Sequence, residues 1–410
     1  MFLYNLGINL MSGAMRLASL WDQKSKKWVD GRKDIFERLD AAIKPQDKIC
    51  WVHAASLGEF EQGRPVIEEI RNKFPDYTIL LTFFSPSGYE IRKGYRGADY
   101  IFYLPADTPG NMKKFVKIAH PEITIFVKYE FWLNCLDELH KSGCKTYLIS
   151  SIFRKSSIFF RWYGEAFRKC LKTFKHIFVQ DENSKQLLAD IGINEVSVAG
   201  DTRFDRVSAI HESSKRIPLI DRFKEGRPTF ITGSTWEPDE QLLLPVINKH
   251  PEMKFIIAPH VINNDRIKQL EEMFGDRMCR FTYCAEDPKF DYAGKQVLVI
   301  DTIGYLSSAY RYADYAYIGG GFGVGIHNTL EAATFSLPVA FGPNYRKFKE
   351  AHDLVDLGAA KSVSDAEQLA AWLDEFINDR DKYEDASQKA AKYISNNKGA
   401  TDIIMKSIFG

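Results

Sequence analysis

The 410-residue sequence lacks the features that mark several protein classes. Its six cysteines form no CxxC pair and no cluster with histidine, which argues against a disulfide scaffold or a thiolate metal site. We expect reduced, structural thiols, as is usual in the cytoplasm. The formal net charge is only +1, so a general attraction to nucleic acid is not expected. No internal period is short enough for a solenoid.

The residues that are present indicate two α/β domains. A chain of 410 residues, 45% apolar and 27% charged, exceeds what one hydrophobic core usually serves. Short β-rich runs alternate with helical patterns, which is typical of parallel α/β sheets. The predicted strands are residues 48–54, 78–84, 122–128, 145–150 and 176–180, and then 228–234, 254–259, 296–301, 315–320 and 337–341.

Residues 206–227 interrupt this alternation with polar and charged side chains, which suggests a connection between domains. The fold class that we predict is α/β, with two doubly wound, Rossmann-like domains and an intervening cleft. Ligands of such sheets bind outside the carboxyl ends of the strands. The predicted parts are an N-terminal helix and basic segment at 1–33, domains at 34–207 and 228–390, a linker at 208–227, and a C-terminal helix at 391–410.

Residues 2–21 carry a single charge, Arg16, and a basic cluster follows them. No basic region precedes the apolar part, so a secretory signal peptide fits poorly. Interspersed asparagines and glycines argue against a full span of about 20 apolar residues. Four leucines, at positions 3, 6, 10 and 17, fall on one helical face. We predict a helix that lies on the inner leaflet of a membrane, with the basic cluster at anionic headgroups. The alternative is an amphipathic helix packed on its own domain or on a partner.

Residues 317–343 are the richest candidate binding segment, because a predicted strand there ends in five glycines before a helix begins near Asn328. Their backbone amides could hold a phosphate, although the glycines of a tight turn would look the same. No G-x-G-x-x-G register and no GK[ST] motif is present, which disfavours a dinucleotide site. Asn328 and Glu331 could pair as a helix cap, or Glu331 could accept hydrogen bonds from ribose hydroxyls. The combination suits a nucleotide.

Three further loops follow predicted strands, at residues 232–240, 258–260 and 301–314. They offer small hydroxyls, one imidazole, and Gly304, which permits a close approach of the backbone to a ligand. Tyr305 and Leu306 beside it could form a wall for a base. The neighbouring tyrosines at 310, 312, 315 and 317 fit a packing role better than a stacking platform.

In the first domain, the segment HAASLGEFEQG places Glu59 at the start of a helix, where the positive end of the helix dipole favours an ionised carboxylate. Such a carboxylate can accept a proton from a hydroxyl. The alternative is that Glu59 or Glu61 is an ordinary first-turn acid, worth well under about 1 kcal/mol of helix stability. Glu130 repeats the arrangement after another apolar run. His53 fits a satisfied core histidine better than a base.

Taken in order, these segments resemble motifs of 3-deoxy-D-manno-octulosonic acid (Kdo) transferases, membrane-associated inverting glycosyltransferases of lipid A assembly with the GT-B fold. The resembling segments are HAASLGE, YEFWLN, SSIFR, AGDTRFD, GSTWEPDE, DTIGYLSSAYRYADYAYIGGGF and HNTLEAATFSLPVAFGPNYRKFKE. They span nearly the whole chain. The resemblance implies that Glu59 is the general base, with acceptor or transition-state support from Gly58, Glu130 and Ser234. The donor contacts that it implies are Pro259, His260, Gly304, Tyr305, Leu306, Asn328, Thr329, Leu330 and Glu331.

In this interpretation Glu59 deprotonates a primary hydroxyl of the lipid A precursor, lipid IVA, at the cytoplasmic face of the inner membrane. The hydroxyl attacks the anomeric carbon of Kdo in CMP-Kdo, and CMP leaves on the opposite face. CMP-Kdo is already activated, so neither a cofactor nor a metal ion is expected. No nucleic-acid partner is expected either.

Three residues depart from the family pattern. His260 stands where the family commonly has arginine, Lys128 replaces an acid before Glu130, and Tyr305 replaces another acid. Since the charge of an imidazole depends on pH, donor binding could be pH-sensitive, unless Arg346 or Lys347 compensates. Two rival functions stay open. One is another two-domain sugar-nucleotide enzyme, such as a UDP-sugar epimerase or a different glycosyltransferase. The other is a non-catalytic membrane-surface protein that binds a nucleotide or lipid A.

Overall fold

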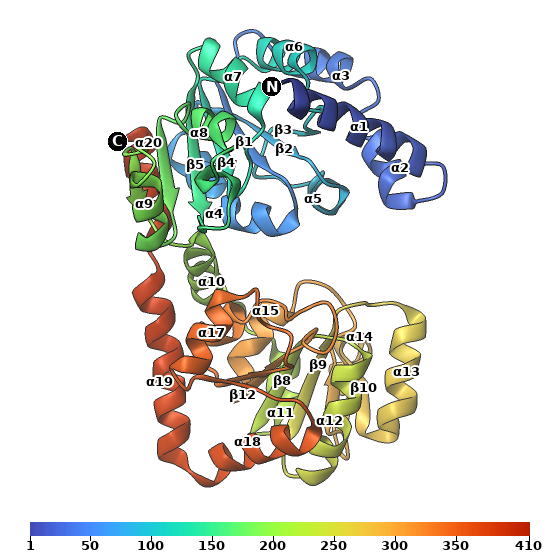
Figure 1. Ribbon diagram of the computed structural model, residues 1–410. Coiled ribbons are helices and arrows are strands. Elements are labelled where there is room, and N and C mark those ends of the chain that lie inside the picture. The colour runs from blue at the N-terminus through green and yellow to red at the C-terminus, as the bar shows by residue number, and fades with distance from the viewer. The chain divides into compact units, whose positions relative to one another are not determined.

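The computed structural model describes residues 1–410 and contains two compact units, residues 1–206 with 398–410, and residues 207–397 (Figure 1). Each unit has one parallel sheet of seven strands, which confirms the predicted fold class of two doubly wound domains. The strand order in the first unit is β3-β2-β1-β4-β5-β6-β7. Its strands are β1 (Ile49–Ala54), β2 (Thr78–Phe83), β3 (Tyr100–Tyr103), β4 (Ile123–Val127), β5 (Lys145–Ser151), β6 (His176–Val179) and β7 (Val196–Val198).

The first sheet has a hydrophobic core on each face, because successive side chains of a strand point to opposite sides. Trp51 of β1 belongs to one core, and its neighbours Cys50 and Val52 belong to the other. Every residue of β1 is buried, as expected for an interior strand of a parallel sheet. The helices that begin in this unit are α1 (Phe2–Ala18), α2 (Gln23–Asp30), α3 (Ile35–Ala42), α4 (Leu57–Lys73), α5 (Pro86–Arg92), α6 (Pro109–Ala119), α7 (Leu133–Lys141), α8 (Glu165–Leu171), α9 (Glu182–Ala189) and α10 (Thr202–Ser213), with a 3₁₀ turn at Ile158–Phe160.

The second sheet has the strand order β10-β11-β9-β8-β12-β13-β14. Its strands are β8 (Thr229–Thr235), β9 (Lys254–Pro259), β10 (Met278–Arg280), β11 (Val297–Val299), β12 (Tyr315–Ile318), β13 (Val339–Phe341) and β14 (Ala360–Ser362). The helices are α11 (Pro218–Lys224), α12 (Glu237–Lys249), α13 (Asn264–Phe274), α14 (Phe281–Glu286), α15 (Leu306–Ala309), α16 (Leu330–Ala333), α17 (Lys349–Asp356), α18 (Ala366–Asn378) and α19 (Arg380–Asn397), with 3₁₀ turns at Gly275–Arg277 and Tyr310–Tyr312.

The segments outside the sheets differ from the predicted boundaries. The predicted linker at 208–227 contains the end of α10 and all of α11. The predicted single helix at 391–410 is instead the end of α19 and a separate helix, α20 (Ala400–Phe409). Figure 1 shows α20 (red) among the elements of the first unit. There the Asp205 carboxylate accepts the Thr401 amide at 2.7 Å, and the Phe409 ring stacks on Phe74 at 4.4 Å.

The N-terminal helix α1 is present as predicted, and it turns its polar side inward. Tyr4 donates a hydrogen bond to Asp107 at 2.6 Å, and Asn134 donates to Asn5 at 2.8 Å. Ile8 is its one buried residue. Its leucines face outward and are 79% (Leu3), 45% (Leu6), 66% (Leu10) and 60% (Leu17) exposed. None of the helices is both long enough and apolar enough to span a bilayer.

Candidate functional site

Glu59 lies in the first turn of α4, the helix that follows the interior strand β1. Ser56 precedes the helix with an extended backbone (φ −139°), and its hydroxyl donates a hydrogen bond to the Glu59 carboxylate. Glu59 is half-buried, and Gly58 beside it is exposed. β1 and β4 are neighbours whose connections leave in opposite directions across the sheet, so this is the topological switch point of a doubly wound fold. An accessible carboxylate therefore stands where such sheets bind ligands.

Glu130 follows β4, the other strand of this switch point, and is 7% exposed. Its Oε2 accepts hydrogen bonds from Trp132 Nε1 at 2.6 Å and from His53 Nε2 at 3.1 Å. The other ring nitrogen of His53, Nδ1, lies 2.7 Å from the Thr82 hydroxyl, so both ring nitrogens have hydrogen-bond partners. The prediction that His53 is a satisfied core histidine is confirmed. Glu130 is thus a fixed, buried carboxylate.

Backbone conformation marks the ends of β4 and of β8 in the second unit. Lys128, directly after β4, and Ser234, near the end of β8, are non-glycine residues with φ of 72° and 56°. The pairing of β8 with β9 is irregular between Gly233 and Thr235, so Ser234 occupies a bulge. Left-handed conformations of non-glycine residues cost energy and concentrate at functional sites. Both strand ends therefore combine candidate residues with a strained backbone.

The glycine-rich segment after β12 is packed tightly against two neighbouring strand ends. A Cβ atom on Gly319 would lie 2.4 Å from the Ser234 carbonyl oxygen, and one on Gly321 would lie 2.6 Å from the Gly342 Cα. The amides of Gly319, Gly320, Gly323 and Gly325 donate to protein acceptors at 2.9 to 3.1 Å. Those four amides are therefore not available to a phosphate. For them the tight-turn alternative is correct, since they let three loops approach closely.

Asp239, in the first turn of α12, connects this glycine segment to β8 and β12. It is 1% exposed and accepts hydrogen bonds from the Gly320 amide (2.9 Å), the Tyr317 hydroxyl (2.8 Å) and the Trp236 amide (2.8 Å). A buried carboxylate with three donors is fully satisfied. Asp239 therefore fixes the ends of β8 and β12 relative to each other at the switch point of the second sheet.

Three aromatic rings stack outside these strand ends. The His260 ring, after β9, contacts the Trp236 ring at 4.7 Å and the His327 ring at 4.4 Å, with ring planes inclined by 26° and 25°. Trp236 Nε1 also donates to His327 Nε2 at 3.3 Å. Burial lowers the pKa of His260 below its ordinary value. Burial and then the neighbouring His260 lower the pKa of His327 to about 4. Both imidazoles are therefore neutral at pH 7.

The predicted donor contacts divide into accessible and buried residues. His260, Gly304 and Tyr305 are exposed, whereas Ser234, Leu306, Asn328 and Glu331 are half-buried. The side chains of Pro259, Thr329 and Leu330 are buried, and the Thr329 hydroxyl has no hydrogen-bond partner. Of these three, only the backbone could reach a ligand.

The predicted helix cap at Asn328 is displaced by one residue, because the N-cap of α16 is Thr329 and no side chain caps the helix there. Asn328 and Glu331 are nevertheless hydrogen-bonded to each other. Asn328 Oδ1 accepts the Leu330 amide at 3.1 Å, and its Nδ2 donates to Glu331 at 3.2 Å. Gly304 has a φ of 97°, which a side chain would strain, and no atom lies within 4 Å of the position of a Cβ. The Tyr305 ring contacts Phe281 at 4.5 Å. The backbone at Gly304 is thus open to a ligand.

Comparison with known proteins shows similarity to one enzyme family. Residues 33–206 match the family model described as 3-deoxy-D-manno-octulosonic-acid transferase (kdotransferase). Relatives named 3-deoxy-D-manno-octulosonic acid transferase include that of Bordetella pertussis, 26% identical over 95% of both chains. That of Rickettsia prowazekii is 25% identical over 96% of this chain and 87% of its own length. The first unit thus matches the Kdo transferase family, and nearly the whole chain is similar to named Kdo transferases. This similarity supports a glycosyltransferase.

Solved structures are similar to this chain in fold alone. UDP-GlcNAc 2-epimerase from Neisseria meningitidis, bound to UDP-GlcNAc, has a TM-score of 0.60 at 16% identity over 88% of this chain and 99% of that chain. A putative UDP-N-acetylglucosamine 2-epimerase from Listeria monocytogenes has a TM-score of 0.59 at 12% identity over 88% of this chain and 96% of that chain. At such identities the similarity says nothing about the reaction.

The sequence argument missed Trp236, Asp239 and His327. All three lie in the segments that follow β8 and β12, and these two strands adjoin in the sheet. Trp236 lies next to the strand end where His260 stands in place of the arginine common in the family. The Trp236 ring stacks on His260.

Proposed function

We propose that this chain transfers Kdo from CMP-Kdo to the lipid A precursor lipid IVA in lipopolysaccharide core biosynthesis, with Glu59 as the general base. The single observation that carries the base assignment is the accessible Glu59 carboxylate at the switch point of the first sheet. It is held by the hydroxyl of Ser56. Similarity to Kdo transferases supports the donor and the acceptor class.

In the proposed reaction the Glu59 carboxylate takes the proton of a primary hydroxyl of the acceptor. The oxygen then forms a bond to the anomeric carbon of Kdo, while the bond from that carbon to the phosphate oxygen breaks. CMP leaves with the electron pair as a phosphate monoester, and the anomeric configuration inverts. General-base assistance of this kind contributes about 10² to 10⁴ in rate.

On the donor side, the accessible groups suit a cytidylate. Asn328 and Glu331 provide acceptors and donors for ribose hydroxyls, and the exposed backbone at Gly304 can approach the ligand closely. His260 is the accessible group at the position of the family's arginine. Since the amides of four glycines are already bonded, His260 is the main candidate for contact with the phosphate.

We also propose that the chain acts at the cytoplasmic face of the inner membrane. Support comes from α1, which turns four leucines toward solvent while its polar side chains bond to its own unit. A helix packed only on its own domain would bury its apolar face instead. The alternative of a packed amphipathic helix therefore explains the contacts of the polar side but not the exposed leucines.

The test compares Glu59→Gln with Glu61→Gln in full-length protein. Glu61 lies on the same helix, and its carboxylate bonds to Arg92 at 2.7 Å, so it is a matched control. With CMP-Kdo and lipid IVA, we expect mass analysis of the lipid to show transfer reduced at least about 100-fold in Glu59→Gln. Glu61→Gln should stay within a few-fold of the natural protein, and both variants should still bind CMP-Kdo.

Three results would contradict the proposal. Full turnover by Glu59→Gln would remove the base assignment. Conversion of UDP-GlcNAc without Kdo transfer would favour the epimerase-like rival. Binding of CMP-Kdo without any product, in the natural protein, would favour a non-catalytic role.

A further inference from the structure

Four cations lie after β4 and β5 in the first unit, at the sheet edge that carries Glu59. We call them the β4–β5 cations, and they are Lys128, Arg154, Lys155 and Arg161. Lys128 is half-buried directly after β4, and the other three are exposed. Residues 152–164, which follow β5, include no acid. No ion pair joins any of the four side chains to a carboxylate.

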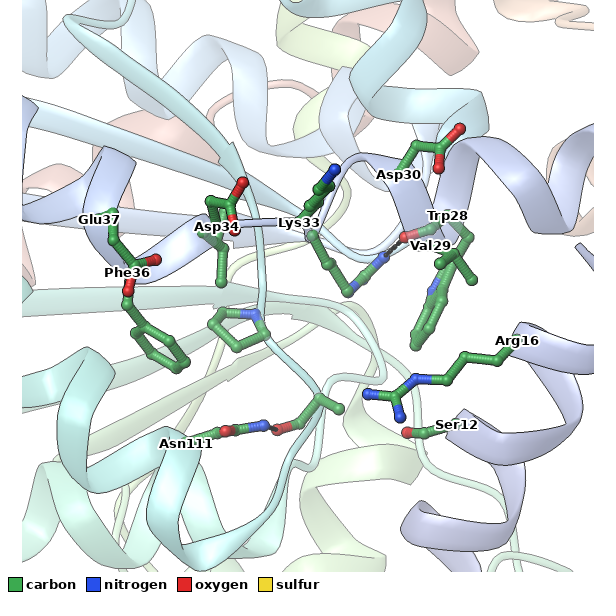
Figure 2. Close-up of a pocket in the computed structure, with 14 residues that line it drawn as sticks. Ser12, Arg16, Trp28, Val29, Asp30, Lys33, Asp34, Phe36, Glu37 and Asn111 are labelled. Carbon is green, nitrogen blue, oxygen red and sulfur yellow. Dashed lines mark hydrogen bonds between the residues drawn. The ribbon is translucent and has the colours of Figure 1, made fainter.

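Charges elsewhere in the first unit are matched more closely. A cavity of about 410 Å³ beside α1 and α2, shown in Figure 2, has as many acids as cations in its lining. Its charged residues are Arg16, Arg32, Lys33, Asp30, Asp34 and Glu37. The whole chain has a formal net charge of only +1. The β4–β5 cations are therefore a local exception, and a group of this kind attracts anions.

Two acids lie at neighbouring strand ends, and the protein itself binds both. Glu130, after β4, is buried and accepts hydrogen bonds from Trp132 and His53. Asp181, after β6, accepts the Ser184 amide at the start of α9, at 2.7 Å. Four cations thus stand against two acids, so this surface is positively charged.

Strand pairing and ring contacts hold the segments of the β4–β5 cations side by side. The Lys128 amide donates a hydrogen bond to the Ile149 carbonyl oxygen at 2.9 Å, which connects the end of β4 to β5. The Phe131 ring contacts the Phe153 ring at 6.0 Å and the Phe159 ring at 4.7 Å. These contacts pack the segment after β4 against the segment after β5. The two segments therefore form one surface.

Lys128 lies close to Glu59, the proposed general base. β4 pairs with β1, and Glu59 is in the first turn of the helix after β1. Neighbouring strands lie about 4.8 Å apart, so the backbone of Lys128 is one strand spacing from the chain that leads to Glu59. The φ of 72° at Lys128 costs energy in a residue with a Cβ, and strain of this kind concentrates at ligand sites. A functional role for Lys128 is therefore indicated.

The proposed acceptor has the chemistry that this surface suits. Lipid IVA carries a phosphate on the same sugar ring as the primary hydroxyl that receives Kdo. A phosphate in that position lies near Glu59 whenever the hydroxyl does. Beside Arg161, the rings of Trp162 and Tyr163 are 90% and 59% exposed, which suits a lipid better than free phosphate.

We propose that Lys128 and Arg154 bind the phosphate on the sugar of the acceptor that receives Kdo. Both cations donate charge-assisted hydrogen bonds to the phosphate oxygens. The bound phosphate then holds the neighbouring primary hydroxyl at Glu59. This recognition rests on the proposed function, since the phosphate belongs to the acceptor named there.

The experiment measures the dissociation constant of the acceptor in detergent micelles by calorimetry, with the full chain and without CMP-Kdo. Two acceptors are compared, lipid IVA and the same lipid without the phosphate on that sugar. Lys128→Gln/Arg154→Gln removes both proposed contacts. The control Lys145→Gln/Lys175→Gln removes two exposed cations at the opposite edge of the same sheet, one at the start of β5 and one just before β6.

We expect Lys128→Gln/Arg154→Gln to bind lipid IVA at least about 30-fold more weakly than the natural protein, because two hydrogen bonds between charged groups are lost. For the lipid without the phosphate, this pair and the natural protein should bind within a few-fold of each other. The control pair should bind both lipids like the natural protein. Lys128→Arg keeps the charge and should bind lipid IVA within a few-fold of the natural protein.

An equal loss for the two lipids, or an equal loss in the two pairs, would overturn the proposal. Weaker binding of CMP-Kdo by Lys128→Gln/Arg154→Gln, with unchanged binding of lipid IVA, would overturn it by assigning these cations to the donor. Because the acceptor is bound without CMP-Kdo, the result does not depend on turnover. The expected binding pattern without any Kdo transfer by the natural protein would support the phosphate site and contradict the proposed reaction.

Discussion

At the scale of single residues, the pair of stacked imidazoles gives the donor side of the molecule a charge that depends on pH. His260 and His327 are 4.4 Å apart, and burial lowers both pKa values. The groups that face them are the Trp236 ring and, behind its amide, the buried Asp239 carboxylate. An anion beside His260 favours the protonated form and raises its pKa in the complex. Binding then takes up a proton at every pH between the free and the bound pKa.

We therefore predict that CMP-Kdo binds more tightly at about pH 6 than at about pH 8. The sign follows from linkage between proton and donor binding. Affinity for CMP-Kdo rises as the pH falls from the pKa of His260 in the complex toward its lowered pKa in the free protein. Above the first value and below the second, the affinity does not change with pH. Isothermal titration calorimetry measures the dissociation constant. His260→Arg should bind more tightly at about pH 8 and lose the pH dependence, and His260→Gln should bind weakly at both values. The same slope in His260→Gln would assign the proton to another group.

Some of these residue roles could be predicted from sequence, and others could not. The position of Glu59 at a helix start and the burial of His53 in a strand were predictable, because local patterns decide them: a helix start after an apolar run, and a polar residue inside one. The stack of Trp236, His260 and His327 was not, because it forms only when the ends of three strands, distant in sequence, lie together. For the same reason, the sequence could not show that glycine amides after β12 donate hydrogen bonds to distant residues, such as Gly320 to Asp239.

At the scale of elements, the glycine segment after β12 allows close packing of neighbouring loops, and the effect of adding a methyl group to each glycine can be measured. A methyl group on Gly319 or Gly321 would meet backbone atoms of another loop at 2.4 Å and 2.6 Å. We predict that Gly319→Ala and Gly321→Ala each lower the free energy of unfolding of the second unit by at least about 1–3 kcal/mol. The added methyl group would meet backbone atoms, and these cannot move aside as the end of a flexible side chain can. Thermal unfolding followed by circular dichroism measures the loss.

Gly323→Ala is the matched control for these substitutions. Its added methyl group would have one neighbour, the Gly320 carbonyl oxygen at 4.0 Å, so we expect a change within about 0.5 kcal/mol. If all three variants had the same lowered melting temperature, close packing would not be the reason for the glycines. Stable Gly319→Ala and Gly321→Ala variants would contradict it equally.

Strand prediction also succeeded or failed by position in the sheet. All ten strands predicted from apolar runs are interior strands, and the four that were missed, β3, β7, β10 and β14, are the edges of the two sheets. Interior strands such as β1 and β9 are buried throughout, so they appear in sequence as continuous apolar runs. The edge strands have three or four residues and are partly exposed, so no run marks them.

At the scale of the whole molecule, the two ends of the chain have different roles in the first unit. The C-terminal α20 returns to this unit and buries its apolar residues there, among them Ile404 and Met405. The sequence pattern indicated a helix at this end but not its contact, which depends on Asp205. The N-terminal α1 is attached by polar bonds and keeps its leucines outside. The first helix, unlike the last, thus leaves apolar surface for something else to cover.

We predict that Leu10→Gln/Leu17→Gln lowers the partition of the full chain into bilayers at least about ten-fold, because burial of a leucine side chain contributes about 1.5–3 kcal/mol. Flotation with phosphatidylcholine vesicles at high salt measures this apolar contribution, since salt screens the basic residues. Ile91→Gln/Ile403→Gln is the control, because these side chains of α5 and α20 are 59% and 44% exposed on the same unit. The control pair should partition like the natural protein. Equal losses would mean that no particular face inserts, and unchanged partition of the leucine pair would mean that α1 is covered by protein instead of lipid.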